Sequence, residues 1–288
     1  MMWLPMSYYS GKCLADGRGK MPYNIITLDS TGEHQIDLVS ASYWNNEDLE
    51  KNKAFNVIDL GFDKIEASLK YKHLLDQIEC LLARYKISVE NSNILSVASG
   101  TCWVESQWLK NQQFRALHCI DISRHRIHKL APFTMEHYGV VGDVDFLHGS
   151  VFDLDAKHKS YEIIFLSQAF HHIEEPIRLL RFLKQLLSEN GVILIVGEHY
   201  YTRFDYHKRA FKHFVKYFIN RKGYRSLKQF YPSWQDLFPP DLDKGDIHWS
   251  ASEYDFIFKK AGFSYYEHDV HESRIFQSFI LPMKDNHA

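Results

Sequence analysis

The sequence predicts an α/β fold whose core is a doubly wound sheet. Five short apolar runs alternate with segments of helical character between residues 93 and 198. Strands that are separated by helical crossovers of about 10–15 residues form parallel sheets. The runs are also apolar at consecutive positions, which is typical of strands that helices cover on both faces. With 288 residues, 45% of them hydrophobic, the chain has enough apolar material for such a core.

The predicted strands and helices follow one another in a regular order. The strands are NILSVAS (93–99), RALHCID (115–121), VDFL (144–147), YEIIFLS (161–167), GVILIVGE (191–198) and two last segments at about 263–270 and 274–281. A long amphipathic helix precedes them, because apolar residues recur at helical spacing between Ile65 and Tyr85. The clearest crossover helix follows the fourth strand. Pro176 lies in its first turn, and we expect Gly191 to end it.

Three segments of the chain belong to the predicted core or flank it. Residues 1–64 are aromatic and irregular and form a predicted N-terminal cap or arm, in which two short strands flank the turn Asp29–Gly32. Residues 65–202 form the core itself. Residues 248–288 complete it with a capped helix, SASEYDFIFKKAGF, and the last two strands.

A fourth segment, residues 203–247, is predicted to be an inserted helical lid. Between Arg203 and Lys228, nine Lys or Arg residues stand against a single acid, Asp205, and phenylalanines are interleaved with them. This pattern indicates a basic amphipathic helix. Such a helix could cover an acidic substrate, lie on a membrane surface or hold a partner subunit.

The composition argues against several classes of function. The chain has 34 Lys and Arg and 36 Asp and Glu, a formal charge of −2, so we expect no nucleic-acid partner. No apolar stretch approaches the roughly 20 residues of a membrane span, so we expect no integral membrane association. The start of the chain lacks a charged region followed by an apolar one, which favours the cytoplasm. The four cysteines form no C-x-x-C pair and predict reduced thiols.

Two sets of residues lie where a doubly wound sheet binds its ligand, at the carboxyl ends of the strands. The turn Ala98–Thr101 enters a helix after the first strand, and its N–H groups can receive an anionic group. Asp121 ends the second strand, where a carboxylate can accept hydrogen bonds from both hydroxyls of a ribose. The pair predicts a nucleoside-bearing cofactor. The alternative is that Gly100 makes a turn and Asp121 caps the next helix.

The ordered series of segments resembles the class I S-adenosylmethionine-dependent methyltransferases. NILSVASGTCWVESQWL stands where that family has its hhDhGxGxG cofactor loop, and HCIDIS stands at its acid-ended second strand. Later segments match in order, namely FLHGSVFDL, YEIIFLSQAFHHIEEP, LLSENGVILIVGEHYY and ASEYDFIFKKAGF. The resemblance covers residues 65–200 and 248–281. It implies an enzyme with a Rossmann-like mixed sheet of seven strands, the last one antiparallel.

The resemblance also implies which residues bind S-adenosylmethionine. The backbone of the loop would approach the methionine portion, Asp121 would hold the ribose, and further residues would border the adenine and the sulfonium. The implied cofactor-binding residues are Ala98, Ser99, Gly100, Thr101, Asp121, Ile122, Ser150, Val151, Ser167 and Gln168. Four residues depart from the family pattern: Ser96 and Ser150 replace acids, and Ala98 and Cys102 replace glycines. These departures leave open a catalytically silent relative with a binding or regulatory role.

Histidines follow the fourth and fifth strands, beside the expected position of the methyl group. A neutral imidazole can take the proton of a hydroxyl acceptor during methyl transfer. His172 is the first candidate for this catalytic base, then His171, and His199 ends the fifth strand on the same edge. Each could instead serve packing or helix entry. We expect no metal, because adjacent histidines usually point apart and no i, i+4 histidine pair supports them.

The sequence therefore predicts a methyltransferase that acts on a small molecule, with O-methylation of a sugar or another secondary metabolite as the leading hypothesis. An NAD-dependent dehydrogenase is the second hypothesis, because the spacing from Gly100 to Asp121 suits a dinucleotide site. Its turn, however, lacks the G-x-G-x-x-G pattern. The sequence leaves room for a homo-oligomer.

Overall fold

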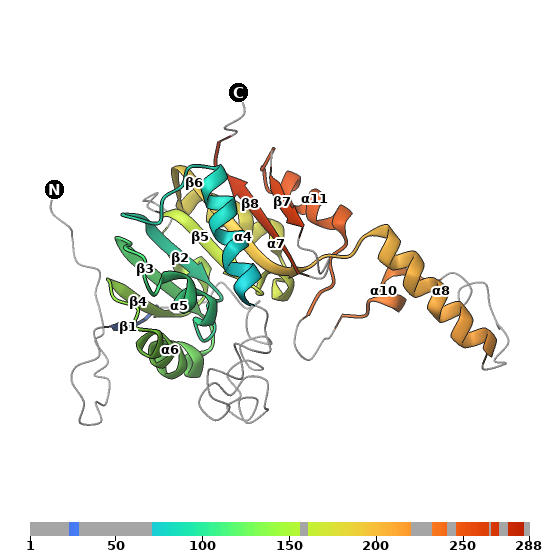
Figure 1. Ribbon diagram of the computed structural model, residues 1–288, viewed down its shortest axis with the longest axis horizontal. Helices are drawn as coiled ribbons and strands as arrows, with labels where there is room; N and C mark the ends of the chain where they lie inside the picture. Colours follow the sequence, from blue (N-terminus) through green and yellow to red (C-terminus); the bar gives the residue numbers. More distant parts are fainter. Residues whose placement is uncertain are drawn as a thin grey trace.

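The computed structural model describes residues 23–28, 71–155, 161–219, 232–240, 246–264, 266–270 and 276–284. Its centre is an eight-stranded sheet in the order β1-β4-β3-β2-β5-β6-β8-β7 (Figure 1). The strands are β1 (Asn24–Thr27), β2 (Asn93–Val97), β3 (Ala116–Asp121), β4 (Val144–His148), β5 (Tyr161–Ser167), β6 (Leu187–His199), β7 (Glu267–Val270) and β8 (Phe276–Pro282). The pairs among β1 to β6 are parallel, and β8 is antiparallel to both neighbours. The predicted mixed sheet with an antiparallel last strand is confirmed.

The predicted number of seven strands is wrong, because the sheet has an additional edge strand. β1, which the sequence places in the N-terminal cap, pairs in parallel with β4 from Asn24 opposite Asp145 onward. The pairing satisfies backbone groups that β4 would otherwise expose at the sheet edge. Tyr23 anchors the strand, since its hydroxyl donates to the carbonyl of Val140 at 3.0 Å. The turn Asp29–Gly32 and the rest of the predicted cap lie outside the described residues.

Helices cover both faces of the sheet, as a doubly wound core requires. One face packs against α4 (Tyr71–Arg84), α5 (Trp103–Leu109) and α6 (Ala131–Tyr138), and the other packs against α7 (Pro176–Leu186) and α11 (Ala251–Lys260). Successive residues of the buried strands point to opposite faces, so each strand contributes to both clusters in turn. This arrangement explains why the strand sequences are apolar at consecutive positions.

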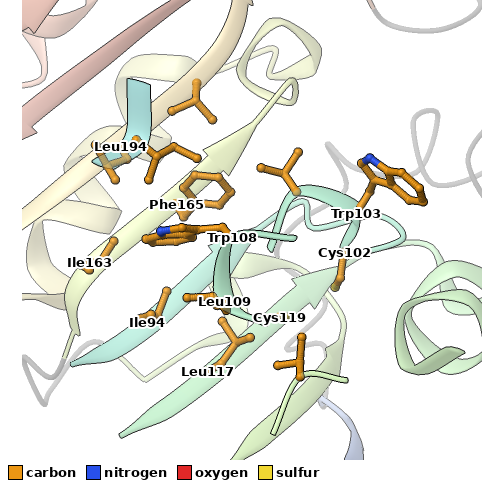
Figure 2. Close-up of a cluster of buried hydrophobic side chains, with 14 of the residues drawn as sticks. Ile94, Cys102, Trp103, Trp108, Leu109, Leu117, Cys119, Ile163, Phe165 and Leu194 are labelled. Carbon is orange, nitrogen blue, oxygen red and sulfur yellow. The ribbon is translucent and has the colours of Figure 1, made fainter. Parts of the chain in front are cut away.

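The contact of α5 with the sheet fixes the helix that follows the loop after β2. Trp108 lies against β5, with its ring 5.2 Å from the ring of Phe165 between centroids. Leu109 points toward Leu117 of β3, and Ile94 of β2 lies beside them (Figure 2). All these side chains are buried. The amino-terminal turn of α5 is therefore held firmly at the carboxyl end of β2.

The helix α7 ends earlier than the sequence predicts. Pro176 occupies its first turn as expected, but the helix stops at Leu186 rather than at Gly191. Leu187 already pairs with Tyr161 of β5, and a register shift separates this pair from the next one. Gly191 lies inside β6, where a Cβ atom would come within 2.7 Å of the carbonyl oxygen of Tyr161. The glycine thus permits a close approach of strands instead of ending a helix.

The inserted segment begins with a helix at the predicted residue. α8 (Arg203–Ile219) and the short α10 (Trp234–Leu237) project away from the sheet (Figure 1). The predicted continuation of the basic helix to Lys228 lies outside the described residues. The chain then returns to the core, where the predicted helix cap is confirmed, and Ser250 rather than Ser252 caps α11 with its side chain. None of the described helices is both long and apolar enough to cross a membrane.

Candidate functional site

A cavity of about 280 Å³ opens at the carboxyl ends of β2, β3 and β5, where the strand order reverses. Nine of the ten predicted cofactor-binding residues line it, namely Ala98, Ser99, Gly100, Thr101, Asp121, Ile122, Val151, Ser167 and Gln168. Ser150 does not line the cavity. Its hydroxyl instead accepts a hydrogen bond from the N–H of Phe152 and caps a short helical turn. The cavity therefore lies where a doubly wound sheet binds ligands.

The loop after β2 keeps a left-handed backbone at three alternate positions. The φ angles are 51° at Ala98, 55° at Gly100 and 53° at Cys102. Ala98 and Cys102 stand where the family that the sequence resembles has glycines. For residues other than glycine this conformation costs about 1–2 kcal/mol each, and such strain clusters at functional sites. The loop path therefore survives the loss of both glycines.

Asp121 connects this loop with the segment after β3. Its two carboxylate oxygens accept hydrogen bonds from the N–H groups of Gly100 and Ser123, each at 2.7 Å. Burial raises the pKa of Asp121, although the nearby Arg126 and these N–H groups pull it down, and the pKa stays above its ordinary value. A carboxylate has about four acceptor positions, so two remain for ligand hydroxyls. The turn-stabilising and ribose-binding interpretations are compatible.

Glu105 is a cavity residue that sequence analysis missed. It lies in the first turn of α5, is 2% exposed and lines the cavity. Its carboxylate accepts a hydrogen bond from the hydroxyl of Ser96, the residue that stands in place of the family's first-strand acid. Burial raises the pKa of Glu105 to about 7. A detectable signal was present, since Glu105 is the single acid in the helix WVESQWL that follows the loop.

His171 forms a buried pair with Glu198 behind the cavity. Its Nδ1 lies 2.8 Å from Oε2 of Glu198, and the same carboxylate accepts hydrogen bonds from three consecutive backbone N–H groups, Ala169 to His171. Burial lowers the pKa of His171, but the charge and hydrogen bond of Glu198 outweigh it and raise the pKa. Burial raises the pKa of Glu198, yet His171 brings it below its ordinary value. This pair holds the turn that carries both histidines.

His172 lines the cavity and pairs with an acid from the far end of the inserted segment. Its Nδ1 lies 3.0 Å from Oδ1 of Asp246, and the two side chains are 21% and 24% exposed. The next residue, Ile247, donates its N–H to the carbonyl of His171 at 2.8 Å, which holds Asp246 in place. Sequence analysis missed Asp246, because only folding brings it to a residue 74 positions earlier.

Further histidines extend this cluster away from the cavity. The ring of His199 lies 5.5 Å from His171 and 6.0 Å from His248, and it does not line the cavity. Burial and the neighbouring His171 lower the pKa of His199. The rings of His171 and His172 are 4.1 Å apart, so the expectation that they point apart is wrong. Ligand atoms of His171, His172 and Asp246 all lie within 4.8 Å of one another, a grouping that could hold a metal ion.

Comparisons with known proteins agree with this fold. Solved structures with similar folds include a candidate O-methyltransferase from Nostoc punctiforme, with a TM-score of 0.51 and 14% identity over 85% of this chain and 68% of that chain. A candidate S-adenosylmethionine-dependent methyltransferase from Methanococcus maripaludis has a TM-score of 0.50 and 15% identity, over 83% of this chain and 95% of that chain. Magnesium protoporphyrin IX methyltransferase from Synechocystis has a TM-score of 0.50 and 12% identity, over 85% of this chain and 96% of that chain. No curated protein matches the chain.

A family model gives the assignment that the structural likeness alone does not. The model is described as a methyltransferase domain and matches residues 66–268, more than half of the chain. The matched range contains the strained loop, the cavity and the histidine cluster. The dehydrogenase hypothesis is thereby set aside. The chain belongs to the methyltransferase-domain family.

Proposed function

We propose that the protein transfers a methyl group to a hydroxyl of a small molecule, such as a sugar or another secondary metabolite. The observation that carries this proposal is the pairing of His172 with Asp246 on the wall of the cavity. A carboxylate beside an imidazole orients the ring and stabilises its protonated form. Hydroxyl acceptors need such a base, because their proton must leave as the new bond forms.

The residues of the cavity fit S-adenosylmethionine. We propose that the strained loop lies against the methionine portion, that Asp121 accepts the ribose hydroxyls and that Ile122 and Val151 border the adenine. Ser167 and Gln168 border the sulfonium in this arrangement, and Ser150 acts through the turn it caps. When bound, the cofactor supplies an activated methyl group and a thioether leaving group.

His172 is the proposed general base. Oδ1 of Asp246 lies 3.0 Å from Nδ1, a position that favours the proton on Nδ1. In that tautomer, Nε2 carries the lone pair that takes the hydroxyl proton of the acceptor. His171 is a proposed positioning residue, because its carbonyl holds the segment that carries Asp246. His199 lies behind His171, 5.5 Å away between ring centroids, and it does not line the cavity, so we propose no contact between it and the acceptor.

Aromatic side chains beside the cluster support an acceptor with a ring. Tyr201 lies 5.7 Å from His248 between ring centroids, and the indole N–H of Trp234 donates to the carbonyl of His248. Phe238 stacks on Trp234 at 4.3 Å. Phe238 is buried beneath Trp234, so we propose that the acceptor ring contacts the partly exposed Tyr201 and Trp234, while the histidines supply polar partners.

A test of this function compares His172→Ala with the wild type. An acceptor screen with sugars and small phenols would follow transfer of an isotopically labelled methyl group. We expect turnover to fall by about 10²- to 10⁴-fold while cofactor affinity stays nearly unchanged. His137→Ala, at an exposed position of α6, is the matched control.

Two outcomes would contradict the role of His172. Full activity of His172→Ala would assign the residue to packing. Loss of wild-type activity in a chelator, with recovery on addition of a divalent metal, would make His172 a metal ligand beside His171 and Asp246. If the folded protein binds the cofactor but methylates none of these acceptors, the hydroxyl class is the wrong substrate class.

The surroundings of the site stay predictions from the sequence. They include a cytoplasmic location, a homo-oligomer and a lid formed by residues 203–247. The exposed side chains of Phe204 and Phe211 on the basic helix α8 support a surface that covers an acceptor or contacts a partner.

A further inference from the structure

We propose that Glu105 is the binding site for the α-ammonium group of S-adenosylmethionine. The inference rests on the cofactor arrangement proposed above. In this arrangement Glu105 of α5 supplies the carboxylate that Ser96 of β2 lacks. It also makes cofactor affinity depend on pH near neutrality.

The position of Glu105 suits a cationic ligand. The residue belongs to the first turn of the helix that the loop Ala98–Thr101 enters, and it lines the cavity although only 2% of it is exposed. The hydroxyl of Ser96 donates to one carboxylate oxygen. The backbone N–H of Glu105 also donates to the carboxylate. A carboxylate has about four acceptor positions, so positions remain for a ligand in the cavity.

No cation of the described residues balances this carboxylate. None of the described salt bridges includes Glu105, and the charge that acts on it, from Asp121, has the same sign. A buried carboxylate without a positive partner is costly, and strongly perturbed groups of this kind cluster at functional sites. S-adenosylmethionine carries an ammonium group and a sulfonium, so it brings positive charge to a cavity that holds two buried acids.

The buried position of Glu105 in α5 affects the protonation of its carboxyl. Burial raises the pKa of Glu105 to about 7, so protonated and ionised forms of this carboxyl coexist near neutral pH. An ammonium group binds the ionised form, and binding therefore releases that proton. The other titratable groups around it are Asp121, which the Gly100 and Ser123 N–H groups hold, and the thiols of Cys102 and Cys119, whose pKa burial raises. Arg126 lines the same cavity near Gly100.

Two ligands that differ in the amino-acid portion separate this role from general pocket shape. S-adenosylhomocysteine carries the α-ammonium group, and 5′-methylthioadenosine lacks it. For Glu105→Gln we expect the affinity for S-adenosylhomocysteine to fall by about 10- to 100-fold, the loss of a charged hydrogen bond, and the affinity for methylthioadenosine to change little. Calorimetry gives both affinities, and Glu136→Gln at an exposed position is the matched control.

The wild-type chain provides a second measurement that requires no variant. Titration with S-adenosylhomocysteine in buffers of different ionisation heat counts the protons released. We expect about half a proton at pH 7, and an affinity that rises about tenfold from pH 6 to pH 8. Methylthioadenosine should release none. A Ser96→Asp/Glu105→Gln double variant should recover affinity, because it returns an acid to the strand.

Several results would overturn the inference. They are unchanged affinity of Glu105→Gln, an equal loss for both ligands, or no proton release by the wild type. Binding of methylthioadenosine alone by the wild type would refute the ammonium site and leave the adenosine site intact. Failure of both ligands to bind a folded wild type would refute the proposed cofactor arrangement itself.

Discussion

At the scale of single residues, the loop after β2 shows that the residue type matters less than the backbone conformation. Ala98 and Cys102 adopt the left-handed angles that glycine adopts without strain. From the sequence alone, these two residues and Ser96 indicate a degenerate cofactor loop. The structure gives a different picture, because the loop keeps its turn and Glu105 brings a carboxylate to Ser96. The contact between Glu105 of α5 and Ser96 of β2 can be recognised only in the folded structure.

Asp121 is the residue where loop geometry and cofactor binding meet. We expect Asp121→Ala to weaken binding of S-adenosylhomocysteine by about 1–3 kcal/mol, because a charged acceptor is lost. Calorimetry measures this change. Since Asp121 also holds the N–H of Gly100, thermal unfolding of the variant should be recorded beside it. Unchanged affinity in a folded variant would contradict the ribose role.

Glu105 should also affect the stability of the free protein in a pH-dependent way. Its pKa is about 7 in the folded chain and about 4.5 when exposed, so the unfolded state releases its proton first as pH rises. The folded state therefore loses stability between pH 4.5 and pH 7. Compared with the wild type, Glu105→Gln should gain on the order of 3 kcal/mol between pH 5 and pH 8.

Urea unfolding of both chains at a series of pH values measures this difference. The comparison cancels titration of groups that the two chains share. A difference that does not change with pH would mean that Glu105 has an ordinary pKa in the folded protein.

At the scale of elements, the segment before α11 connects a helix cap with the site. Ser250 accepts a hydrogen bond from the N–H of Glu253, and the Glu253 side chain accepts from the N–H of Ser250. The same short segment carries Asp246 and His248. A capping box was predictable from SASE, whereas the contact of Asp246 with His172 depends on how the inserted segment returns.

The cap gives a prediction for the element. Ser250→Ala should lower the free energy of unfolding by about 1 kcal/mol, because the N–H of Glu253 loses its acceptor. Ser252→Ala, two residues further on at an exposed position, removes a hydroxyl 3.1 Å from that of Ser250 and leaves the capping oxygen in place, so it should have a smaller effect. Urea denaturation measures both. An equal loss in the two variants would mean that the cap contributes little.

At the scale of the whole molecule, the fold was predictable to the extent that its elements are periodic and local. The apolar runs predicted the parallel strands and both covered faces, because each run carries its own pattern. The edge strand β1 was not predictable as part of the sheet, since four residues must find β4 more than 100 positions later. The same limit applies to the site: Asp121 follows its strand directly, while the pairs His171–Glu198 and His172–Asp246 form only through tertiary structure.

The buried pair His171–Glu198 joins the ends of β5 and β6, so its loss should affect the entire chain. His171→Ala leaves the Glu198 carboxylate buried without its partner, and we expect a cost of about 3–5 kcal/mol. Glu198 has a lowered pKa, so its contribution to the free energy of unfolding is lost as the pH falls below the ordinary pKa of a glutamate. The contribution of His171, whose pKa is raised, is lost as pH rises above about 6.5.

The difference between wild type and His171→Ala should therefore be largest between about pH 4.5 and pH 6.5. Chemical denaturation at pH 4, 5.5 and 8 checks this window, with His137→Ala as the control. A difference of equal size at all three values would show that the side chain contributes by packing rather than by charge.

The edge strand β1 also affects whether the sheet can pair with strands of other chains. A parallel sheet that ended at β4 would offer a row of unsatisfied backbone groups to any other extended chain. β1 occupies that row with only four residues, and the short strand that replaces it as the edge is a poor template for further pairing. β1 thus shields this edge of the sheet from pairing with other chains.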